Sequence, residues 1–597
     1  MPKVVEQPGM GTSLLDMLDA RFEENMSRRR RHLPKWKEAV RFVDPSRARW
    51  TGADTDDPTK SRSAIIDETA TWCHGVAVAG NVSGMASPGR PWFQLRLGDY
   101  SLNQKGSVKA WLRTMRTAVL TIFERSNFYQ QLGEMFGDEL IVANAPLGIF
   151  EDPDPSKYMR FEVPPIGSWA IAQDGAGRPI VFQRELTKTI RQLLNEFGEA
   201  NVSSRVKMRA QEQGGLSDTV EVRHMILPNP DYIPESMVVT RLPYQEVYWE
   251  HLVGSGLAGR DPGIPSAGTG TGGRHHEKPL KRSGYHEFPY ALARGRRNIE
   301  DTYGVNCETY NALASIKQLQ VQEDKVLLGL ELEVEPPMLA GSGVDRRHLS
   351  IVPGTQTKDA GVDGSGGSRP LYQVKLDYEA LEAKSEQVRM RIKRAYKVDV
   401  FQTVLSDDRS QRATATEIDE TRREALQALG PSLQRHSDDV FDVVVDRAMA
   451  IILRRSELAW QTGEPSLVPP PPEELRGQEI RIQYISEIAQ AQQAQGLMSI
   501  ERVVDFGTRY SQFQPEALDR LDVDEIMERY ADSAGVDPSV IRDLDEAIDI
   551  RNRRAQAQQE AAMREQAAGM AGAVRNLSET RMGGDSALDR MVQAAAI

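Results

Sequence analysis

Two helical stretches separated by an irregular segment constrain the fold of this chain more than any other feature. In residues 301–335, Leu, Ile and Val recur every three or four positions until Pro336 and Pro337 end the pattern. A second stretch of this kind, residues 375–397, follows residues 338–374, whose centre is rich in Gly and Ser. The sequence therefore predicts two helices that flank an irregular insert.

The rest of the chain predicts an α+β fold that is predominantly helical. Between Ala145 and Trp249 the apolar positions alternate in short runs, which is typical of strands. Elsewhere they keep the helical period. Helices are predicted at residues 12–42, 60–90 and 106–144, and from Thr414 through a break at Gly430 and Pro431 to Leu453. Strands are predicted at 92–97 and 480–485, and flexible Gly-rich loops at 254–273 and 361–367. From Arg551 the sequence predicts a long exposed helix or a disordered tail.

Composition excludes several classes of protein. The formal net charge is −12 at pH 7 and 40% of the 597 residues are hydrophobic, a balance typical of globular proteins. An acidic chain is not a generic nucleic-acid binder, because phosphates attract basic surfaces. Two cysteines, Cys73 and Cys307, cannot form a disulfide framework or a Cys-rich zinc site. No stretch is apolar enough for a transmembrane helix, so no membrane partner is expected.

Motifs typical of enzymes are weak or absent. The pattern G-x-G-x-x-G begins at Gly254 and again at Gly268, but Pro and His residues follow where a dinucleotide site requires a helix. No P-loop, H-E-x-x-H or G-x-S-x-G motif occurs, so movement of DNA would need an external motor. His275 and His276 are interpreted as incidental in a Gly-rich loop. No catalytic residue, metal or cofactor is expected.

Two basic runs stand out in the sequence. Arg28 to Arg31 lie within the first predicted helix. Contact with DNA or with an acidic partner is one interpretation, and a solvated face balanced by nearby glutamates is the preferred one. The second run ends the helix predicted at 375–397. It comprises Arg389, Arg391, Lys393, Arg394 and Lys397. The helix dipole favours cations at this end, and contact with a polyanion accounts for them equally well.

One segment resembles a signature of phage head-to-tail connector (portal) proteins of the short-tailed, T7-like kind. It runs from Gly84 to Phe93 and contains Pro88, Arg90, Pro91, Trp92 and Phe93. Further similarities follow in the family's order: Trp36 to Pro45, Tyr303 and Gly304, Ala312 to Leu319, Pro336 and Pro337, Thr414 to Glu417, Leu429 to Pro431, and Tyr484 with Ser486. The chain departs from the family at Val305-Asn306-Cys307, where Arg-Ser-Pro is usual, and at Glu487, where Pro is usual.

The resemblance implies a portal fold assembled as a ring of twelve copies. Mapped on this sequence, its parts are N-terminal helices with an α/β wing at 1–300, a first stem helix at 301–335, a clip at 336–374, a second stem helix at 375–397, a tunnel loop at 398–412 containing Arg409 and Arg412, post-tunnel wing and crown helices at 413–550, and a C-terminal helical extension or disordered tail at 551–597. Under this model the basic run from Arg389 to Lys397 faces the DNA channel or a neighbouring subunit.

The resemblance also implies a function and partners. A portal is a structural conduit at one capsid vertex, through which double-stranded DNA passes without sequence specificity during packaging and ejection. It contacts the major capsid and scaffold proteins, seats the terminase motor at its clip and later binds tail adaptor or nozzle proteins. The implied location is the head-tail junction of the virion, and the host cytoplasm during assembly. An acidic ring suits this role, because each phosphate contact adds affinity and friction.

Two other functions are compatible with the residues. One is a metal-dependent DNA-processing enzyme that uses two acidic clusters. These are Asp522, Asp524 and Glu525, and Asp543, Asp545 and Glu546. Carboxylates two positions apart on a helix point to different faces, so a solvated surface is the preferred interpretation. The other is a helical scaffold protein that forms no ring, which the Ala- and Gln-rich C-terminal residues suggest. Nuclease activity with Mg²⁺ would support the first, and ring stoichiometry separates the second from a portal.

Overall fold

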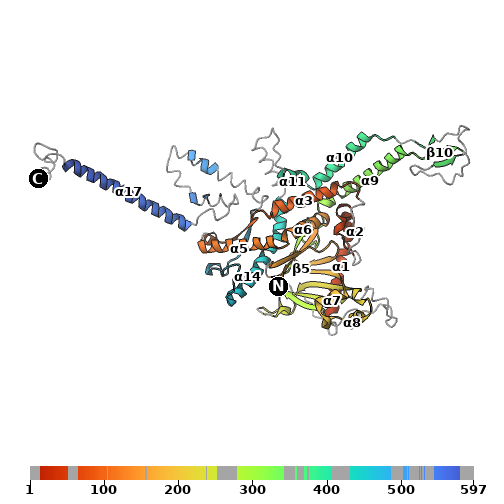
Figure 1. Cartoon of the computed structure of the whole chain (residues 1–597), viewed down its shortest axis with the longest axis horizontal. Helices are drawn as coiled ribbons and strands as arrows, with labels where there is room; N and C mark the ends of the chain where they lie inside the picture. The colour runs from red at the N-terminus through yellow and green to blue at the C-terminus, as the bar shows by residue number, and fades with distance from the viewer. Residues whose placement is uncertain are drawn as a thin grey trace. The chain divides into compact units, whose positions relative to one another are not determined.

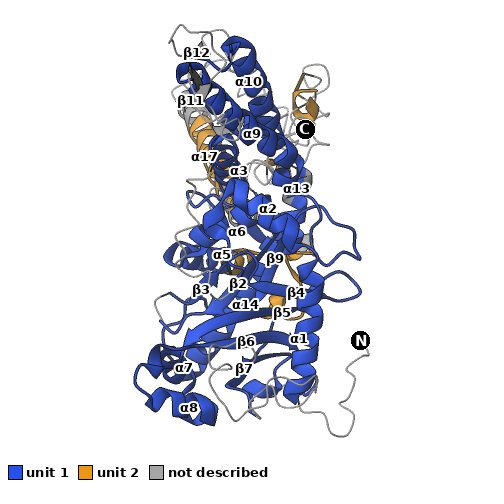
Figure 2. Cartoon of the chain, turned by 90° about the vertical axis from the view of Figure 1, so that its right-hand side faces the viewer, with its two compact units in different colours: residues 1–95, 113–470, 482–492 blue, residues 96–112, 471–481, 493–597 orange. Residues whose placement is uncertain are grey.

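The computed structural model divides into two compact units (Figure 2). Unit 1 comprises residues 1–95, 113–470 and 482–492, and unit 2 comprises residues 96–112, 471–481 and 493–597. The structure describes residues 14–50, 65–103, 105–154, 157–234, 236, 238–251, 278–341, 356–359, 369–372, 375–405, 430–485 and 544–578, with the short pieces 502–506, 508–509, 523–524, 526–527 and 530. These residues form helices and sheets, as the predicted α+β class requires.

The helices follow one another along the whole chain. In chain order they are α1 (Leu14–Arg30), α2 (Leu33–Val43), α3 (Thr69–Met85), α4 (Tyr100–Asn103), α5 (Gly106–Arg125), α6 (Phe128–Val142), α7 (Ile190–Phe197), α8 (Ser204–Gln211), α9 (Glu308–Val334), α10 (Tyr378–Ala395), α11 (Val398–Leu405), α13 (Gly430–His436), the π-helical segment η9 (Ser437–Phe441), α14 (Asp442–Thr462) and α17 (Leu544–Ser578).

Most of the strands lie between α6 and α9. In chain order the strands are β1 (Phe93–Leu97), β2 (Asn144–Glu151), β3 (Met159–Glu162), β4 (Trp169–Gln173), β5 (Pro179–Thr189), β6 (Thr219–Pro228), β7 (Tyr244–His251), β8 (Lys281–Tyr285), β9 (Tyr290–Arg294), β10 (Met338–Gly341), β11 (Gln356–Asp359), β12 (Arg369–Pro370) and β13 (Ile480–Tyr484). The strands predicted at 92–97 and 480–485 are therefore present as β1 and β13.

The N-terminal residues form two helices, so the single helix predicted at 12–42 is wrong. α1 ends at Arg30 and α2 begins at Leu33, with Pro34 in its first turn. Proline has no N–H to donate and its ring clashes with a preceding helical turn. It therefore begins a helix more readily than it continues one.

The basic run Arg28–Arg31 is mostly a solvated face, as predicted, with one exception. Arg28 and Arg30 pair with glutamates of the same helix at the surface. Arg29 is buried, and its guanidinium donates to two backbone carbonyl oxygens at and just before the start of β4. Charge alone did not distinguish this internal arginine from its neighbours.

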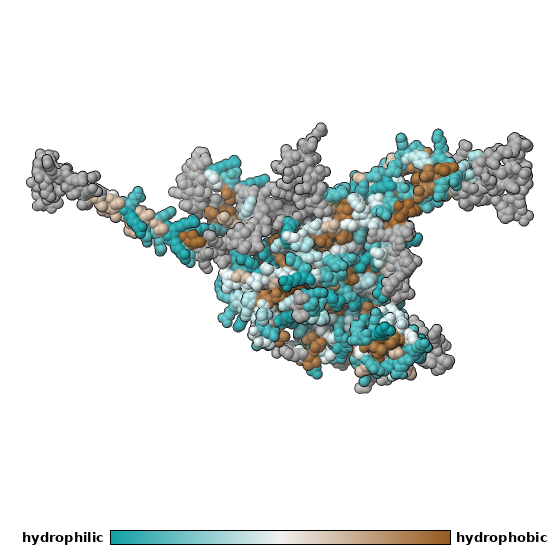
Figure 3. Space-filling view, in the orientation of Figure 1, coloured by the Kyte–Doolittle hydropathy of each residue, from teal (hydrophilic) through white to brown (hydrophobic). Residues whose placement is uncertain are grey.

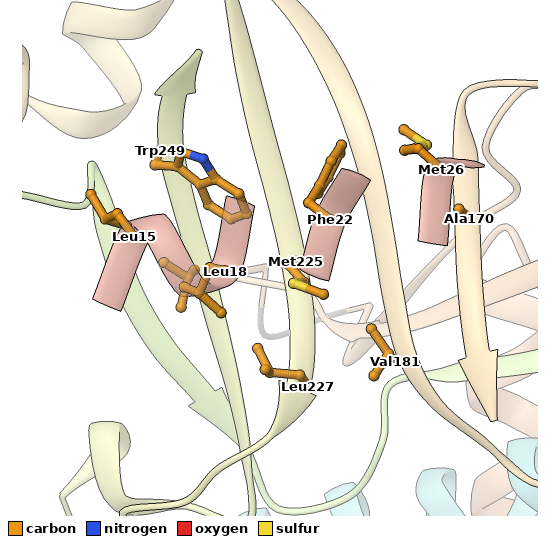
Figure 4. Packing of buried hydrophobic residues seen from close by; sticks show 10 residues of the cluster. Leu15, Leu18, Phe22, Met26, Ala170, Val181, Met225, Leu227 and Trp249 are labelled. Carbon is orange, nitrogen blue, oxygen red and sulfur yellow. The ribbon is translucent and has the colours of Figure 1, made fainter. Parts of the chain in front are cut away.

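A five-stranded antiparallel sheet, in the order β4-β5-β6-β7-β8, carries α1 on one face (Figure 4). The side chains that α1 buries recur every three or four residues and share one face of the helix. The cluster comprises Leu15, Leu18, Phe22, Met26, Ala170, Val181, Met225, Leu227, Val247 and Trp249. Burial of each large apolar side chain contributes about 1.5–3 kcal/mol, so this contact fixes α1 on the sheet.

A second sheet, in the order β3-β2-β9, packs against α6 and α14. The helix predicted at 106–144 is two helices, α5 and α6, because the chain bends at Asn127. The side-chain amide of Asn127 donates to the carbonyl oxygen of Phe161 across 2.8 Å and accepts from its N–H across 2.9 Å. These hydrogen bonds to β3 fix the break between α5 and α6, and no local sequence pattern predicts them.

Helices α9 and α10 lie side by side and extend away from the sheets of unit 1 (Figures 1 and 2). They correspond to the helices predicted at 301–335 and 375–397, each somewhat shorter. Gly329 permits close packing here, since a Cβ at this position would lie 2.7 Å from Leu376 Cδ1. Where an irregular insert was predicted, the described residues form a small sheet in the order β11-β10-β12. Strands of two to four residues are too short to show a periodic pattern.

The segment after the hairpin is partly helical, although a loop was predicted at 398–412. Residues 398–405 form α11, whose Val398 and Phe401 are buried. The ring of Phe401 packs on Gly80 of α3, so this tertiary contact stabilises a helix too short to be stable alone. Residues 406–412, with Arg409 and Arg412, lie outside the described residues.

A continuous helical stretch runs from α13 through the π-helical segment η9 to α14. Gly430 and Pro431 are its first residues. The helix predicted to continue through Val440 to Leu453 is therefore present. The predicted start of the preceding helix, at Thr414 and Glu417, lies outside the described residues.

In unit 2 the long helix predicted from Arg551 begins earlier, at Leu544, and extends to Ser578 as α17. Every side chain from residue 551 to 571 is exposed. Near its start, Arg551 makes a two-pronged contact with the carboxylate of Asp524, at 2.5 and 2.6 Å. Among the described residues, no helix combines the length and the apolar character that a bilayer span requires.

Candidate functional site: the helical hairpin and its base

Arg389 on α10 ties the hairpin to the start of α3. Its Nε donates to Asp67 Oδ2 across 3.0 Å, and its Nη2 donates to Glu323 Oε1 of α9 across 3.1 Å. Its Nη1 donates to Glu382 Oε1 across 2.9 Å, and Glu386 lies 3.6 Å away. Burial lowers the pKa of Arg389, but the hydrogen bonds to Asp67 and Glu382 outweigh burial and raise it above the ordinary value. The charge of Arg389 is therefore satisfied within its own chain.

Gln320 fastens the same segment to α9. Its Oε1 accepts from the backbone N–H groups of Ile66 and Asp67 across 2.8 and 3.3 Å, and its Nε2 donates to the carbonyl oxygen of Asp67 across 2.7 Å. Burial raises the pKa of the Asp67 carboxyl, but hydrogen bonds from Thr69 and Arg389 outweigh burial and lower it. This polar cluster could not be predicted from the sequence, because residues 253 positions apart leave no local signal.

The structure divides the predicted basic cluster between different surroundings. Lys393 lies 3.6 Å from Glu386, and Lys397 lies 3.4 Å from Glu308 at the start of α9. By contrast, the side chains of Arg391 and Arg394 are exposed and form no ion pair with any residue that the structure describes. Only part of the cluster is therefore available to a partner.

The outer half of α9 exposes apolar side chains. Leu327, Leu330 and Val334 are 51%, 43% and 71% exposed, although their spacing continues the face that Ile316 buries nearer the body. The space-filling view shows hydrophobic residues along the hairpin in this region (Figure 3). A row of exposed apolar side chains on a projecting helix is a candidate surface for contact with another chain.

A cavity of about 780 Å³ lies at the base of the hairpin. It is lined by charged side chains of both signs, among them Glu308, Lys397 and Arg435. In its wall, His436 Nε2 lies 2.6 Å from Glu139 Oε2, while His436 Nδ1 lies 2.6 Å from the carbonyl oxygen of Ser432. Burial lowers the pKa of His436, but the charge of Glu139 and the hydrogen bonds outweigh burial and raise it. This pair couples α13 to α6.

The cavity holds no activated nucleophile among the residues that the structure describes. Cys307 lies in its wall, and burial raises the pKa of the thiol well above the ordinary value. Burial also raises the pKa of Cys73 to about 12. A thiol acts as a nucleophile when it is ionised. Both cysteines are free and buried, so neither thiol is an activated nucleophile.

The segment Pro88–Phe93 has a structural role. Pro88, Arg90 and Pro91 lie exposed in and after a turn, whereas Trp92 and Phe93 are buried. The Trp92 ring centre lies 5.1 Å from Phe441 and 6.3 Å from Tyr484. Two predicted signature positions, Trp92 and Tyr484, thus meet in one aromatic cluster although they are far apart in sequence.

Tyr303 and Gly304 form the turn that leads into α9. Tyr303 is buried, and its ring centre lies 5.0 Å from His32 and 5.8 Å from Trp36. Gly304 donates its N–H to Asn144 Oδ1 across 2.7 Å, and a Cβ at this position would overlap the carbonyl oxygen of Ala143. The turn therefore needs glycine because another part of the backbone lies against it.

Pro336 and Pro337 follow the end of α9, as predicted. α9 ends at Val334, and β10 begins at Met338. The carbonyl oxygen of Pro337 accepts from the N–H of Leu371 across 2.7 Å. The two prolines thus stop the helix and start the small sheet.

The acidic clusters considered for a metal-dependent enzyme do not form a metal site in the part of the chain that is described. Asp524 directs both carboxylate oxygens at Arg551. No group of three His, Cys, Asp or Glu side chains with metal-binding geometry occurs among the described residues. Asp522, Asp543, His275 and His276 lie outside them.

Comparison with known proteins gives consistent matches along the chain. The family model for "Bacteriophage head to tail connecting protein" matches residues 15–256 and 271–541. The portal protein of Salmonella phage epsilon15 is 31% identical over 561 residues, which cover 94% of this chain and 94% of that protein. The probable portal protein of Bordetella phage BPP-1 is 30% identical over 546 residues, which cover 91% and 92% of the two chains.

Among solved structures, chains of gene transfer agent (GTA) particles match this chain at low identity and low TM-score. A chain of the native GTA virion is 15% identical, covers 67% of this chain and 98% of its own length, and gives a TM-score of 0.26. A chain of the native GTA neck, computed with C12 symmetry, is 11% identical, covers 76% and 90%, and gives a TM-score of 0.29.

Proposed function

The chain belongs to the family of bacteriophage head to tail connecting proteins, and we propose how its parts perform the work of a portal. The protein is a viral portal, a structural component of the virion at the head-tail junction and not an enzyme. The genome passes through it during packaging and ejection. The sequence motifs resemble those of portal proteins, and the family model points to the same function.

The hairpin of α9 and α10 is proposed as the stem of the portal. Both helices pack along each other and extend from the sheets of unit 1, and Arg389 and Gln320 tie them to the body. The remaining assignments follow the order of the sequence. They are a wing at 1–300, a clip at 336–374, a tunnel loop at 398–412, wing and crown helices at 413–550, and a C-terminal helical extension or disordered tail at 551–597.

We further propose that twelve copies form a closed ring. The observation that carries this proposal is the exposed apolar row on the stem, Leu327, Leu330 and Val334. A projecting helix with such a row is poorly suited to water and well suited to a neighbouring copy. One heterologous contact repeated around an axis closes a ring.

The proposed partners follow from the parts of the ring. The terminase motor and later the tail adaptor or nozzle proteins would bind at the clip, and the capsid and scaffold proteins at the wing. Double-stranded DNA would pass through the centre without sequence recognition. The net charge of −12 per chain limits attraction between the ring and the phosphates.

Electron microscopy of the purified chain, combined with its mass from light scattering, tests the ring. Twelve copies of 66.6 kDa give a particle of about 800 kDa with a central channel. A channel wide enough for duplex DNA supports the conduit. A particle without a channel, or a monomer that scaffold protein does not convert to a ring, would contradict the proposal.

A further inference from the structure

The outward side of α10 carries a row of three cations and one glutamine. Lys384, Gln387, Arg391 and Arg394 are separated by three, four and three positions, so they share one face of the helix. All four side chains are exposed, and none forms an ion pair with a residue in the described ranges. We call these four residues the basic row. Arg389 and Lys393 lie on another flank, where glutamates of the same chain neutralise them.

The outward side of α9 carries a matching row of anions. Asp324 and Glu331 are exposed and share the face of α9 that points away from α10, and the exposed Glu335 follows directly at the end of the helix. The α10 side is identified by Gly329, which contacts Leu376, and by Glu333, which accepts from the Tyr378 hydroxyl. We call the three carboxylates the acidic row. Lys325 lies 3.9 Å from Asp324 and is itself exposed.

Apolar side chains lie within or beside both rows. Val321 and Leu328 continue the spacing of the acidic row and are 58% and 37% exposed. Met390 lies next to the basic row and is 37% exposed. Exposed apolar groups among charges are typical of a surface that contacts another protein. A phosphate backbone offers no apolar partner for them.

We propose that the basic row of one copy binds the acidic row of a second copy of this chain. The inference rests on the proposed ring and names the two surfaces that meet in it. The rows lie on opposite sides of one hairpin, so each copy offers both, and the contact repeats around a closed ring. It also means that Arg391 and Arg394 contact a protein partner and not the DNA.

The two rows are staggered along the hairpin, which determines how neighbouring copies must lie. Arg389 contacts Glu323, so the middle of the basic row is level with residue 323 of α9. The acidic row is centred near residue 330, about seven residues farther out, or about 10 Å at 1.5 Å per residue. Neighbouring hairpins must therefore be inclined relative to the ring axis for the charges to meet.

Two charge-reversal variants of the full-length chain test the inference. The basic-row variant combines Lys384→Glu, Arg391→Glu and Arg394→Glu, and the acidic-row variant combines Asp324→Lys, Glu331→Lys and Glu335→Lys. Each variant alone places like charges at every contact, so we expect about a tenfold or greater fall in the fraction of rings at physiological salt. Combining all six substitutions restores opposite charges and should restore rings.

Mixing the two variants gives a more specific test. A basic-row variant offers two acidic faces and an acidic-row variant offers two basic faces. An equal mixture should therefore form rings in which the two alternate, visible by mass spectrometry of differently tagged chains. The control reverses three exposed arginines away from the hairpin, Arg31→Glu, Arg191→Glu and Arg241→Glu, and should assemble normally. Circular dichroism checks that every variant is folded.

Two outcomes would overturn the inference while leaving the ring intact. One is a basic-row variant that forms rings as readily as the native chain. Another is a variant that forms normal rings but packages DNA differently, which would assign the basic row to DNA. If the native chain itself forms no ring, the proposed assembly fails separately. The mixture then still tests the pairing. The two tagged variants should bind each other, and neither should bind the control variant to the same extent.

Discussion

The Nε of Arg389 on α10 lies 3.0 Å from Oδ2 of Asp67, a residue that precedes α3 and is 322 positions away in sequence. The same guanidinium also reaches Glu323 on α9. One side chain therefore joins three segments at the base of the hairpin. A cation surrounded by carboxylates in this way has a structural role, even though it belongs to a basic run.

Replacing Arg389 should destabilise the protein, whereas replacing Arg391 should not. Arg389→Met leaves the largely buried carboxylate of Asp67 without its partner, so we expect the free energy of unfolding to fall by about 1–3 kcal/mol. Arg391→Met removes an exposed cation and should change the free energy of unfolding by less than about 0.5 kcal/mol. Chemical denaturation of both variants makes the comparison. Equal losses would contradict the assigned role of Arg389.

The pair formed by His436 and Glu139 should make stability depend on pH. The pKa of His436 is raised in the folded chain, so the pair stabilises fully below the ordinary value of 6.5. This stabilisation is lost as pH rises through the folded pKa. Glu139→Gln removes the anion, so the difference in unfolding free energy from the native protein should be largest near pH 6 and shrink toward pH 9. A difference independent of pH would exclude the charged pair.

Gly304 should not tolerate a side chain, in contrast to Gly75. In Gly304→Ala the new methyl group overlaps the carbonyl oxygen of Ala143, so the turn before α9 must move. We expect a loss of about 1–3 kcal/mol in unfolding free energy. Gly75→Ala places a methyl group in open space on helix α3 and should stabilise by up to about 1 kcal/mol. Thermal unfolding distinguishes the two.

The contact between α1 and the five-stranded sheet should depend on Phe22. Phe22 is fully buried, and its ring centre lies 5.7 Å from that of Trp249. Phe22→Ala leaves a cavity and should lower the free energy of unfolding by about 3–5 kcal/mol. Met208→Ala, at a side chain that is 63% exposed, is the control and should cost less than about 0.5 kcal/mol. Comparable losses would show that α1 is not held by this core.

The assignment as a structural protein predicts that the purified chain does not cut DNA. Asp524 already binds Arg551 through both carboxylate oxygens. Incubation of duplex DNA with the protein and Mg²⁺ should leave the DNA intact. Cleavage that Asp522→Ala or Asp543→Ala abolishes would revive the enzyme hypothesis, whereas cleavage that persists in both variants would indicate a contaminating nuclease.

Much of the fold followed from local patterns. The period of three to four predicted α9 and α10, and the alternation between Ala145 and Trp249 predicted strands such as β6. Prediction failed where a tertiary contact decided the outcome. The break at Asn127 is held by β3, and α11 is stabilised by α3. The three strands of the insert were missed because they are too short to carry a pattern.

The sequence by itself determined the class of fold, the helix–insert–helix order and the family, because periodicity, prolines and ordered motifs are local properties of the chain. Only the tertiary structure decided which cations of the basic run are satisfied. Arg389 and Arg391 are two residues apart, yet one lies among carboxylates and the other is exposed. Ion pairs form between side chains that folding brings within about 4 Å. The separation of two residues in the sequence does not predict that distance.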